Sequence, residues 1–489
     1  MLIRFLFILI TIYSSQNVLI SAVFAQQPSN EVQNVLLIIG DDHAVTAAGS
    51  YGNDIIKTPN LDKLASSGIQ FNNAYANAPL CSASRQSLLT GKYPHATGVT
   101  LLFTPFQDKG NITVAEQLRD NGYTTAAIGK MHFNNWIWSS IFKNGMPDHG
   151  FDVRIDRKEH EKYLEKQPPK PVPDTINTWS KKEATTTAYR KNAEKLPQPC
   201  FDEYCESTFL ARKTVEFMKQ NKYQPFFATV GFREPHAPFS FPVEYRDMYS
   251  RQEVPLPSGN PEDDRWVPEI FRDLTDEERR DIIASYYTST TYMDKNIGLI
   301  LDGLKELGLE ENTLVIYLGD HGYLLNEHKR FEKHTMWEES LKAPLIIKAG
   351  KRFQQGRELD QLVGLVDITP TILELTGTSQ PDVVQGKSLV PVLADQTTEH
   401  KEYIFAEFLE DNKAMVANEN WKYIFSSGIR DLGQAYATGY GPPGITHRLY
   451  DLKNDPGETT NLAHKPENQA LLKKFQLENK ELHRQMNVL

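Results

Sequence analysis

The sequence predicts an α/β protein, with a mostly parallel sheet sandwiched by helices and a smaller antiparallel α+β subdomain at the C-terminus. Over most of the chain, short apolar runs alternate with amphipathic segments of helical period, as in parallel strands joined by crossover helices. From about residue 386, short strand patterns follow one another without helices between them, which indicates antiparallel pairing. The length of 489 residues is enough for a large core and for more than one structural unit.

The first 25 residues have the features of a cleaved signal peptide. Arg4 is positively charged, an apolar run covers Phe5–Ile10, and small residues lie within Ser21–Ala25, before the expected cleavage point. An uncleaved anchor is the alternative, but residues 11–17 are too polar for a good membrane span. We therefore expect an exported protein, periplasmic or secreted (or lysosomal in a eukaryote), that is not held in the membrane after cleavage.

Residues 26–385 are expected to form the larger α/β domain. Its strands are apolar runs of a length typical of buried parallel strands, and several of its helices end at glycine or asparagine. The expected strands are residues 34–39, 123–128, 225–230, 313–318 and 345–348, and the expected helices are residues 59–67, 113–120, 206–220, 276–307 and 367–375.

A polar segment, residues 154–199, interrupts this alternation. It is rich in Lys, Glu and Pro, its residues 167–173 are expected to be extended, and it is too long for an ordinary connection. It is either an insertion that faces the substrate or a solvated flap. The C-terminal subdomain, residues 386–489, is expected to contain strands at 403–408, 413–417, 421–425 and 449–452 and a helix at 466–486.

Composition excludes some partners. The formal net charge is −10, so no general affinity for nucleic acid or for an anionic membrane is expected, and an anionic substrate would have to be attracted locally. Cys200 and Cys205 could form a disulfide in an oxidising compartment, or they could be two free thiols. In the first case Cys81 is the cysteine left over.

Ionisable residues follow four of the expected strands, directly after the glycines at positions 40, 129, 231 and 319. Each group alone is usually a turn or a solvated loop. In an open parallel sheet, however, ligands bind outside the carboxyl ends of the strands, so we expect all four groups to face one crevice. Their members are Asp41, Asp42 and His43; Lys130 and His132; Arg233, Glu234 and His236; and Asp320 and His321.

The carboxylates of this set predict a metal site. Asp41, Asp42 and Asp320 would lie together and would repel one another too strongly to stay ionised without a cation. Oxygen ligands favour Ca²⁺ or Mg²⁺, and His321 would add a nitrogen donor.

The basic residues predict the chemistry. Arg85, Lys130 and Lys333 would form a positive shell around the metal, and His132 and His236 could move protons. A metal and several cations around a nucleophile are what the transfer of a tetrahedral oxyanion requires.

Cys81 is expected at the N-terminal end of a short helix. Ser82 and Ser84 favour a helix start and Gly91 favours its end. Arg85 would lie one turn further on, so Cys81 would occupy a positive niche of the kind that makes a cysteine reactive. A lone cysteine is more often a small buried apolar residue, but the four strand-end groups favour a functional one.

The segment Cys81-Ser82-Ala83-Ser84-Arg85, followed by Leu89-Thr90-Gly91-Lys92, resembles the formylglycine signature of the type I sulfatases, in the alkaline phosphatase superfamily. The match continues in order through residues 129–132, 235–236, 319–322 and 333 and extends over nearly the whole mature chain. The pair Asp320-His321 resembles the iduronate-2-sulfatase branch, since many other sulfatases have Asp-Asn there. The family motif usually has Pro where this chain has Ala83.

The resemblance implies that a formylglycine-generating maturation enzyme oxidises Cys81 to formylglycine, whose hydrate attacks sulfur. It also implies one Ca²⁺ ion. The implied ligands of this ion are Asp41, Asp42, residue 81, Asp320 and His321.

The resemblance further implies a role for each remaining site residue. Arg85 steadies the hydrate, and Lys130 and Lys333 hold sulfate oxygens. His236 protonates the leaving alcohol, and His132 takes a proton from the sulfated hydrate so that sulfate leaves and the aldehyde returns.

We therefore expect a sulfuric ester hydrolase that acts on sulfated saccharides, as in polysaccharide degradation. A formylglycine-dependent phosphodiesterase or phosphonate hydrolase is one alternative, because it would use nearly the same site. A non-catalytic relative that binds sulfated glycans is another, but such a protein would not need all of Cys81, Lys130, His132 and His236.

Overall fold

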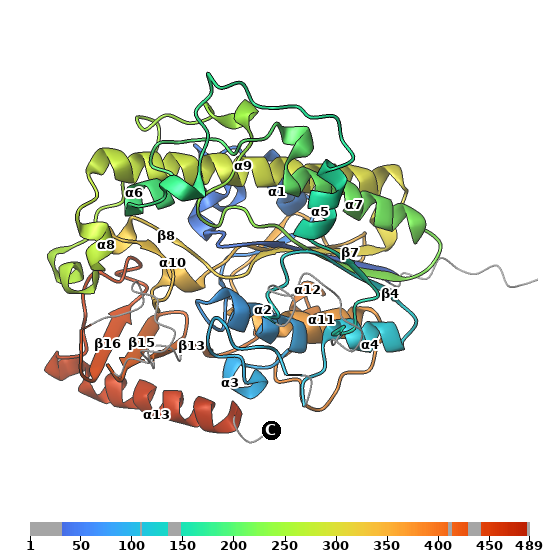
Figure 1. Cartoon of the computed structure of the whole chain (residues 1–489). Coiled ribbons are helices and arrows are strands. Elements are labelled where there is room, and N and C mark those ends of the chain that lie inside the picture. Colours follow the sequence, from blue (N-terminus) through green and yellow to red (C-terminus); the bar gives the residue numbers. More distant parts are fainter. Residues whose placement is uncertain (1–31, 108–109, 135–147, 409–412, 429–441, 487–489) are drawn as a thin grey trace, which may run out of the picture. The chain divides into compact units, whose positions relative to one another are not determined.

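The computed structural model describes residues 32–107, 110–134, 148–408, 413–428 and 442–486 (Figure 1). The expected signal peptide lies outside the described residues. Within those ranges, we find no helix that is both long and apolar enough to cross a membrane.

An eight-stranded sheet forms the centre of the larger domain, in the order β11-β2-β10-β7-β1-β6-β4-β5. The five strands from β7 to β5 run parallel, and β10 is antiparallel to both of its neighbours. This confirms the predicted mostly parallel sheet. The strands are β1 (Asn34–Gly40), β2 (Ile69–Phe71), β4 (Thr124–Gly129), β5 (Val153–Ile155), β6 (Phe226–Gly231), β7 (Thr313–Gly319), β10 (Leu345–Ala349) and β11 (Arg357–Leu359).

Helices cover both faces of this sheet, which is why its central strands are continuous apolar runs. On one face lie α1 (Pro59–Ser66), α7 (Glu206–Gln220) and α9 (Asp276–Glu306), whose apolar side chains pack on the β1 residues Leu36 and Ile38 (Figure 1). Helices on the opposite face pack on the alternate β1 residues. They include α2 (Cys81–Thr90), α4 (Val114–Asp120) and α11 (Ile368–Leu375).

The register of the sheet brings four strand ends level. Gly40 at the end of β1 is paired with Gly319 of β7, and Gly129 of β4 is paired with Gly231 of β6. Gly129 has a φ of +83°, and a Cβ there would lie 2.2 Å from the carbonyl oxygen of Gly231. Glycine is therefore required where β4 turns into the site, and the residues after all four glycines lie at one edge of the sheet, as predicted.

Helix α2 starts one residue earlier than Ser82. Leu80 occupies the N-cap position without a side-chain cap, so the expectation that Ser82 or Ser84 caps this helix was wrong. The Ser84 hydroxyl instead donates a hydrogen bond to the carbonyl of Asp320, which holds the helix against the end of β7. Gly91, with a φ of +66°, ends the helix as predicted.

The C-terminal subdomain is a four-stranded antiparallel sheet, as predicted: β13 (Ile404–Phe408), β14 (Lys413–Ala417), β15 (Trp421–Ser426) and β16 (Thr446–Asp451). The last helix, α13 (Gln469–Met486), packs on one face of this sheet through Leu472 and Phe475. The other face packs on Leu80 and Ala83, at the start of α2. The subdomain therefore supports the helix that begins with Cys81.

The remaining elements are short, and most of them have no periodic signal in the sequence. The strands among them are β3 (Ala74–Tyr75), β8 (Leu324–Leu325), β9 (Phe331–Glu332) and β12 (Val363–Gly364). The helices are α3 (Pro94–Thr97), α5 (Arg157–Leu164), α6 (Thr187–Arg190), α8 (Glu269–Arg272), α10 (Glu338–Leu341) and α12 (Val390–Leu393).

The structure answers one open point of the sequence and fixes one part of the polar segment. Cys200 and Cys205 form a disulfide, with their Cα atoms 5.8 Å apart, and Cys81 is free. In the segment 154–199, the ammonium group of Lys191 is buried, lies 3.2 Å from the Tyr323 hydroxyl and forms an ion pair with Glu332 in β9. The C-terminal part of this segment is thus fixed to the strand that precedes Lys333.

Candidate active site

The residues that follow β1, β4, β6 and β7 meet at the edge of the sheet, together with Cys81 and Lys333. Three overlapping groups each place one potential ligand atom per residue within 4.8 Å of the others. These groups are Asp41, Asp42 and Asp320; Cys81, Asp320 and His321; and Asp42, Cys81 and His236. The metal ligands expected from the sequence therefore lie in one cluster.

Cys81 is the first residue of α2, and it is 1% exposed. Its Sγ lies 3.2 Å from Nε2 of His321 and 3.3 Å from Nζ of Lys333. Burial raises the pKa of the thiol well above its ordinary value, and the nearby lysines Lys130 and Lys333 oppose this without reversing it. The positive niche expected around Cys81 is therefore present, although loss of hydration opposes ionisation of the thiol in it.

Arg85 connects three strand ends. Its Nε donates to Oδ2 of Asp320 at 2.8 Å, and its Nη1 donates to the backbone carbonyl of Lys130 at 2.5 Å. Its Nη2 lies 3.5 Å from Oδ1 of Asp41. The guanidinium is buried, so it fixes the ends of β1, β4 and β7 relative to the start of α2.

Each of the three carboxylates has a basic partner. Nζ of Lys130 lies 2.5 Å from Oδ2 of Asp41, and Lys333 forms an ion pair with Asp42. Burial alone would raise the pKa of Asp41, but the basic groups around it, Lys130 first, hold that pKa well below its usual range. The carboxylates can thus stay ionised through ion pairs, which the sequence argument for an obligatory cation did not include.

Asp42 is held by its backbone as well as by its side chain. It has a φ of +63°, and its N–H donates to Oδ1 of Asp320 at 3.0 Å. Its carbonyl accepts from the Tyr286 hydroxyl at 2.5 Å, and that hydroxyl accepts from the N–H of Ala44 at 2.8 Å. Tyr286, in α9, was not identified from the sequence, where it is one apolar position of a buried helix.

The histidines differ in their exposure. His321 is buried, and its Nδ1 donates to the Gly322 carbonyl at 2.9 Å, which leaves Nε2 facing Cys81. His236 is the open one: its side chain is 40% exposed, Nδ1 donates to the Ala237 carbonyl at 2.8 Å, and Nε2 lies 3.9 Å from Oδ2 of Asp42.

His132 is half-buried. Burial, and then the charge of Lys130, hold the pKa of His132 well below its ordinary value, which favours the neutral ring. Its buried Nδ1 has no hydrogen-bond partner among the described residues.

Comparison of the sequence with models of known protein families identifies the family of this chain. A family model described as "Sulfatase" matches residues 33–378, which is more than half of the chain. The chain belongs to the sulfatase family. A second model, described as "N-sulphoglucosamine sulphohydrolase, C-terminal", matches residues 326–485.

Individual relatives agree with this assignment. A sulfatase of Formosa agariphila is 29% identical over 458 residues, which cover 88% of this chain and 83% of the relative. Iduronate 2-sulfatase of Mus musculus is 27% identical over 402 residues, which cover 72% of this chain and 70% of the relative. The present sulfatase is thus a sulfuric ester hydrolase.

The fold agrees as well. The crystal structure of the phosphonate monoester hydrolase of Agrobacterium radiobacter superposes with a TM-score of 0.76 at 23% identity, covering 93% of this chain and 96% of that one. The alkaline phosphatase-like architecture expected from the sequence is therefore confirmed.

Some residues after the strands have local structural roles in the sulfatase instead of facing Cys81. His43 is buried, with Nδ1 2.5 Å from the Tyr317 hydroxyl and Nε2 2.9 Å from the Ala47 carbonyl. Glu234 accepts a hydrogen bond from Ser207 at 2.5 Å, and Arg233 pairs with Glu206.

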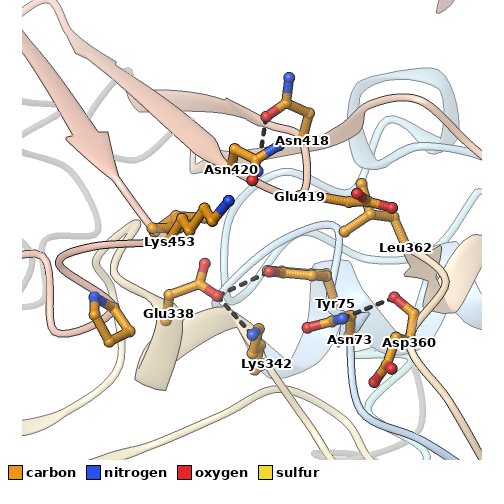
Figure 2. Close-up of a pocket in the computed structure, with 12 residues that line it drawn as sticks. Asn73, Tyr75, Glu338, Lys342, Asp360, Leu362, Asn418, Glu419, Asn420 and Lys453 are labelled. Carbon is orange, nitrogen blue, oxygen red and sulfur yellow. Dashed lines mark hydrogen bonds and ion pairs between the residues drawn. The ribbon is translucent and has the colours of Figure 1, made fainter.

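A polar cavity of about 510 Å³ lies elsewhere, between β3, α10 and the turn from β14 to β15. Figure 2 shows Tyr75 and Lys342 directed at the same carboxylate, Glu338. The Tyr75 hydroxyl and Nζ of Lys342 lie 2.8 and 2.9 Å from Oε2 of Glu338. None of the residues that line this cavity belongs to the cluster around Cys81.

Proposed function

We propose that this sulfatase hydrolyses the sulfate esters of sulfated saccharides, with formylglycine at position 81 and one bound Ca²⁺. The observation that supports this best is the position of residue 81. It lies within 3.3 Å of both Lys333 and His321, in a pocket where an unmodified thiol is held neutral by burial.

A thiol with a raised pKa is a poor nucleophile, because the thiolate is the reactive form. A formylglycine hydrate at the same position would supply a hydroxyl nucleophile instead. Residue 81 begins a helix, whose N-terminal end favours negative charge there. The sequence context, with Arg85 four residues on, fits a maturation enzyme as a partner of the exported chain.

The donor set fits a hard divalent cation. Three buried carboxylates supply oxygen atoms within 4.8 Å of one another, and His321 adds one nitrogen. Oxygen-rich sets of this kind bind Ca²⁺. The residues that would hold the ion are Asp41, Asp42, residue 81, Asp320 and His321. When bound, the cation would supply charge stabilisation for the reacting sulfate.

Lys130 and Lys333 would bind the sulfate group of the substrate. Lys130 is paired with Asp41 and Lys333 with Asp42. A cation on the carboxylates would weaken both ion pairs, so the two ammonium groups could hold sulfate oxygens instead. Arg85, which is buried and triply bonded, keeps its place and orients residue 81.

Two histidines would handle protons. His236 has a half-exposed ring whose Nδ1–H donates to the Ala237 carbonyl, so Nε2 carries a proton only in the imidazolium form. In that form Nε2 would give its proton to the oxygen of the leaving alcohol and leave a neutral ring. His132 has a lowered pKa, which favours the neutral ring, and its buried, unpaired Nδ1 would accept a proton from the group at position 81.

The saccharide substrate is inferred from a relative whose name specifies a sulfated sugar acid, iduronate. The segment 154–199 would shape the entrance for such a substrate, since it is fixed beside Lys333 through Lys191 and Glu332. Export through the N-terminal signal would place the enzyme in the periplasm or outside the cell.

The decisive experiment is peptide mass spectrometry on active, natively produced protein, which should show an aldehyde at residue 81. Cys81→Ala should abolish turnover and leave the fold intact, whereas Ser82→Ala, on the same helix, should stay active. Fully active protein with an unmodified thiol would refute the proposal.

A substrate comparison separates the alternatives. Turnover of defined sulfated oligosaccharides and aryl sulfate should exceed that of aryl phosphate diester. The reverse order would favour a phosphodiesterase, and no turnover of any ester would favour a glycan-binding protein.

A further inference from the structure

A turn between α3 and α4, residues 101–104, presents an aromatic ring to solvent near the catalytic cluster. The N–H of Thr104 donates to the carbonyl of Leu101 at 3.2 Å, which closes the turn. Phe103, the third residue of the turn, is 48% exposed. Exposing a large aromatic side chain gives up the stabilisation that its burial would provide. One exposed apolar residue needs no explanation by itself, so the surroundings of the turn decide how the ring is interpreted.

The turn is attached to the start of α2, the helix that begins with Cys81. The carbonyl of Leu101 accepts a hydrogen bond from the Ser82 hydroxyl at 3.3 Å. The buried side chain of Leu102 belongs to the same apolar cluster as Leu80, the residue before Cys81. The turn is therefore in contact with the residues on both sides of the proposed nucleophile.

The turn is also attached to the segment that follows β4. The side chain of Asn134, two residues after His132, donates through Nδ2 to the carbonyls of Leu102 and Thr104, at 2.7 Å each. Asn134 is buried and has a φ of +66°. The carbonyl of His132 accepts from Nε2 of Gln86 in α2 at 3.0 Å. The turn is thus fixed between the two segments that carry the proposed nucleophile and the proposed base.

These contacts place Phe103 close to the catalytic residues. It is two residues from Leu101, whose carbonyl is bonded to Ser82, and a chain extends by at most about 3.6 Å per residue. The backbone on both sides of the ring is held by buried groups, so the ring is positioned before a substrate arrives. A contact that is positioned in advance costs less conformational entropy on binding.

A flat apolar ring next to a sulfatase site fits one part of a saccharide in particular. Many sugar rings present C–H groups on one face. The face of an aromatic ring has a negative electrostatic potential, which attracts these positively polarised hydrogens and repels an anion such as sulfate. The ring therefore fits a sugar unit, whereas Lys130 and Lys333 fit the sulfate.

We propose that Phe103 is a specificity-determining residue that stacks on the sugar unit next to the sulfated one. This inference rests on the proposed function, the hydrolysis of sulfate esters on sulfated saccharides. The contact favours an oligosaccharide over a sulfated monosaccharide, because binding energy from a neighbouring unit helps to position the sulfate at residue 81.

The test uses the full-length mature enzyme and two matched substrates. They are the defined sulfated tetrasaccharide that the parent protein turns over fastest and the monosaccharide that carries the same sulfate. Phe103→Ala should lower kcat/KM for the tetrasaccharide about tenfold, mainly through a higher KM, and at least about fivefold more than for the monosaccharide. Phe103→Tyr retains a flat ring and should behave like the parent protein, whereas Phe103→Leu should resemble Phe103→Ala.

The matched control is Tyr223→Ala. Tyr223 is 94% exposed, but it precedes β6 and lies at the opposite edge of the sheet from the catalytic residues. This variant should turn over both substrates like the parent protein.

Equal losses on both substrates in a folded Phe103→Ala protein would overturn the proposal, and so would full activity of Phe103→Leu on the tetrasaccharide. Circular dichroism checks the fold of each variant. If the parent protein turns over aryl sulfate but no sulfated saccharide, the proposed saccharide specificity is wrong and this inference with it. If Phe103→Ala turns over the tetrasaccharide as well as the parent protein does, only the stacking role of Phe103 is wrong.

Discussion

Replacing Asp42 with asparagine tests the arrangement of the catalytic cluster most directly. The carboxylate pairs with Lys333, and its Oδ1 lies 3.4 Å from Nε2 of His321 and 3.7 Å from Sγ of Cys81. The amide has nearly the same shape, so Asp42→Asn removes one negative charge and one proposed Ca²⁺ ligand with little change in packing.

The expected loss of stability in Asp42→Asn follows from the burial of the Asp42–Lys333 ion pair. The side chains of Asp42 and Lys333 are 2% and 7% exposed, and the pKa of Lys333 is well above its ordinary value because its attraction to Asp42 outweighs the effect of burial. Removing one partner of a buried ion pair costs about 3–5 kcal/mol. Saturating Ca²⁺, at 100 times its Kd, should stabilise the parent protein by about 2.7 kcal/mol and the variant by almost nothing.

The assay is urea unfolding with and without Ca²⁺, followed by aryl sulfatase activity. We expect a lower midpoint for Asp42→Asn, no Ca²⁺-dependent increase in that midpoint, and activity reduced by about 10² or more. The matched control is Asp367→Asn. Asp367 is also buried and lies 2.6 Å from Nζ of Lys401, so this variant should lose stability but keep the full Ca²⁺ increment.

If Ca²⁺ raises the urea midpoint of Asp42→Asn as much as that of the parent protein, the ion does not bind where we place it. If Ca²⁺ also fails to raise the urea midpoint of Asp367→Asn, the response to Ca²⁺ depends only on the general stability of the protein.

Three further predictions concern other parts of the molecule. Shortening the segment 154–199 by replacing residues 166–178, none of which is buried, with a brief Gly/Ser linker keeps the Lys191–Glu332 ion pair. The shortened segment should lower kcat/KM for a sulfated oligosaccharide at least about tenfold more than for an aryl sulfate, because contacts with remote sugar units provide binding energy that positions the sulfate. Equal losses on both substrates would show that the segment does not shape the entrance. His236→Asn should lower kcat about 10²–10⁴-fold for sugar sulfates and far less for nitrophenyl sulfate, whose leaving group needs no proton, and parallel losses would exclude a general acid. Burial tends to raise the pKa of Asp367, but Lys401 and His400 lower it to about 2, so this carboxylate contributes about 2 kcal/mol above pH 4 that is lost as the pH falls toward 2. The stability difference between the parent and Asp367→Asn, measured by urea unfolding, should therefore shrink between pH 4 and pH 2, and a constant difference would disprove this origin.

The sequence predicted the central strands and the candidate catalytic set because both depend on local patterns. Strand β1 is buried on both faces, so it is an unbroken apolar run, and Gly40 marks its end. The parallel arrangement then places Asp41 beside Asp320 without further information, as the level ends of β1 and β7 confirm.

Other features depend on tertiary surroundings that no local pattern contains. The raised pKa of the Cys81 thiol results from burial, which outweighs the opposing charges of Lys130 and Lys333. Tyr286 holds the backbone of Asp42 from a helix distant in sequence. Phe103 is an ordinary apolar residue in the sequence, and only the structure shows its exposed ring near the start of α2.

The packing of the C-terminal sheet on α2 also affects the order of events during synthesis of the chain. Leu80 and Ala83, on either side of Cys81, are covered by Ile404 and Met415, which the ribosome adds to the chain far later. At about 5–20 residues per second, the interval is on the order of tens of seconds. Cys81 is 1% exposed in the folded chain, so a protein-sized catalyst would have to carry out the proposed oxidation before folding is complete, and a chain that folds first would remain inactive.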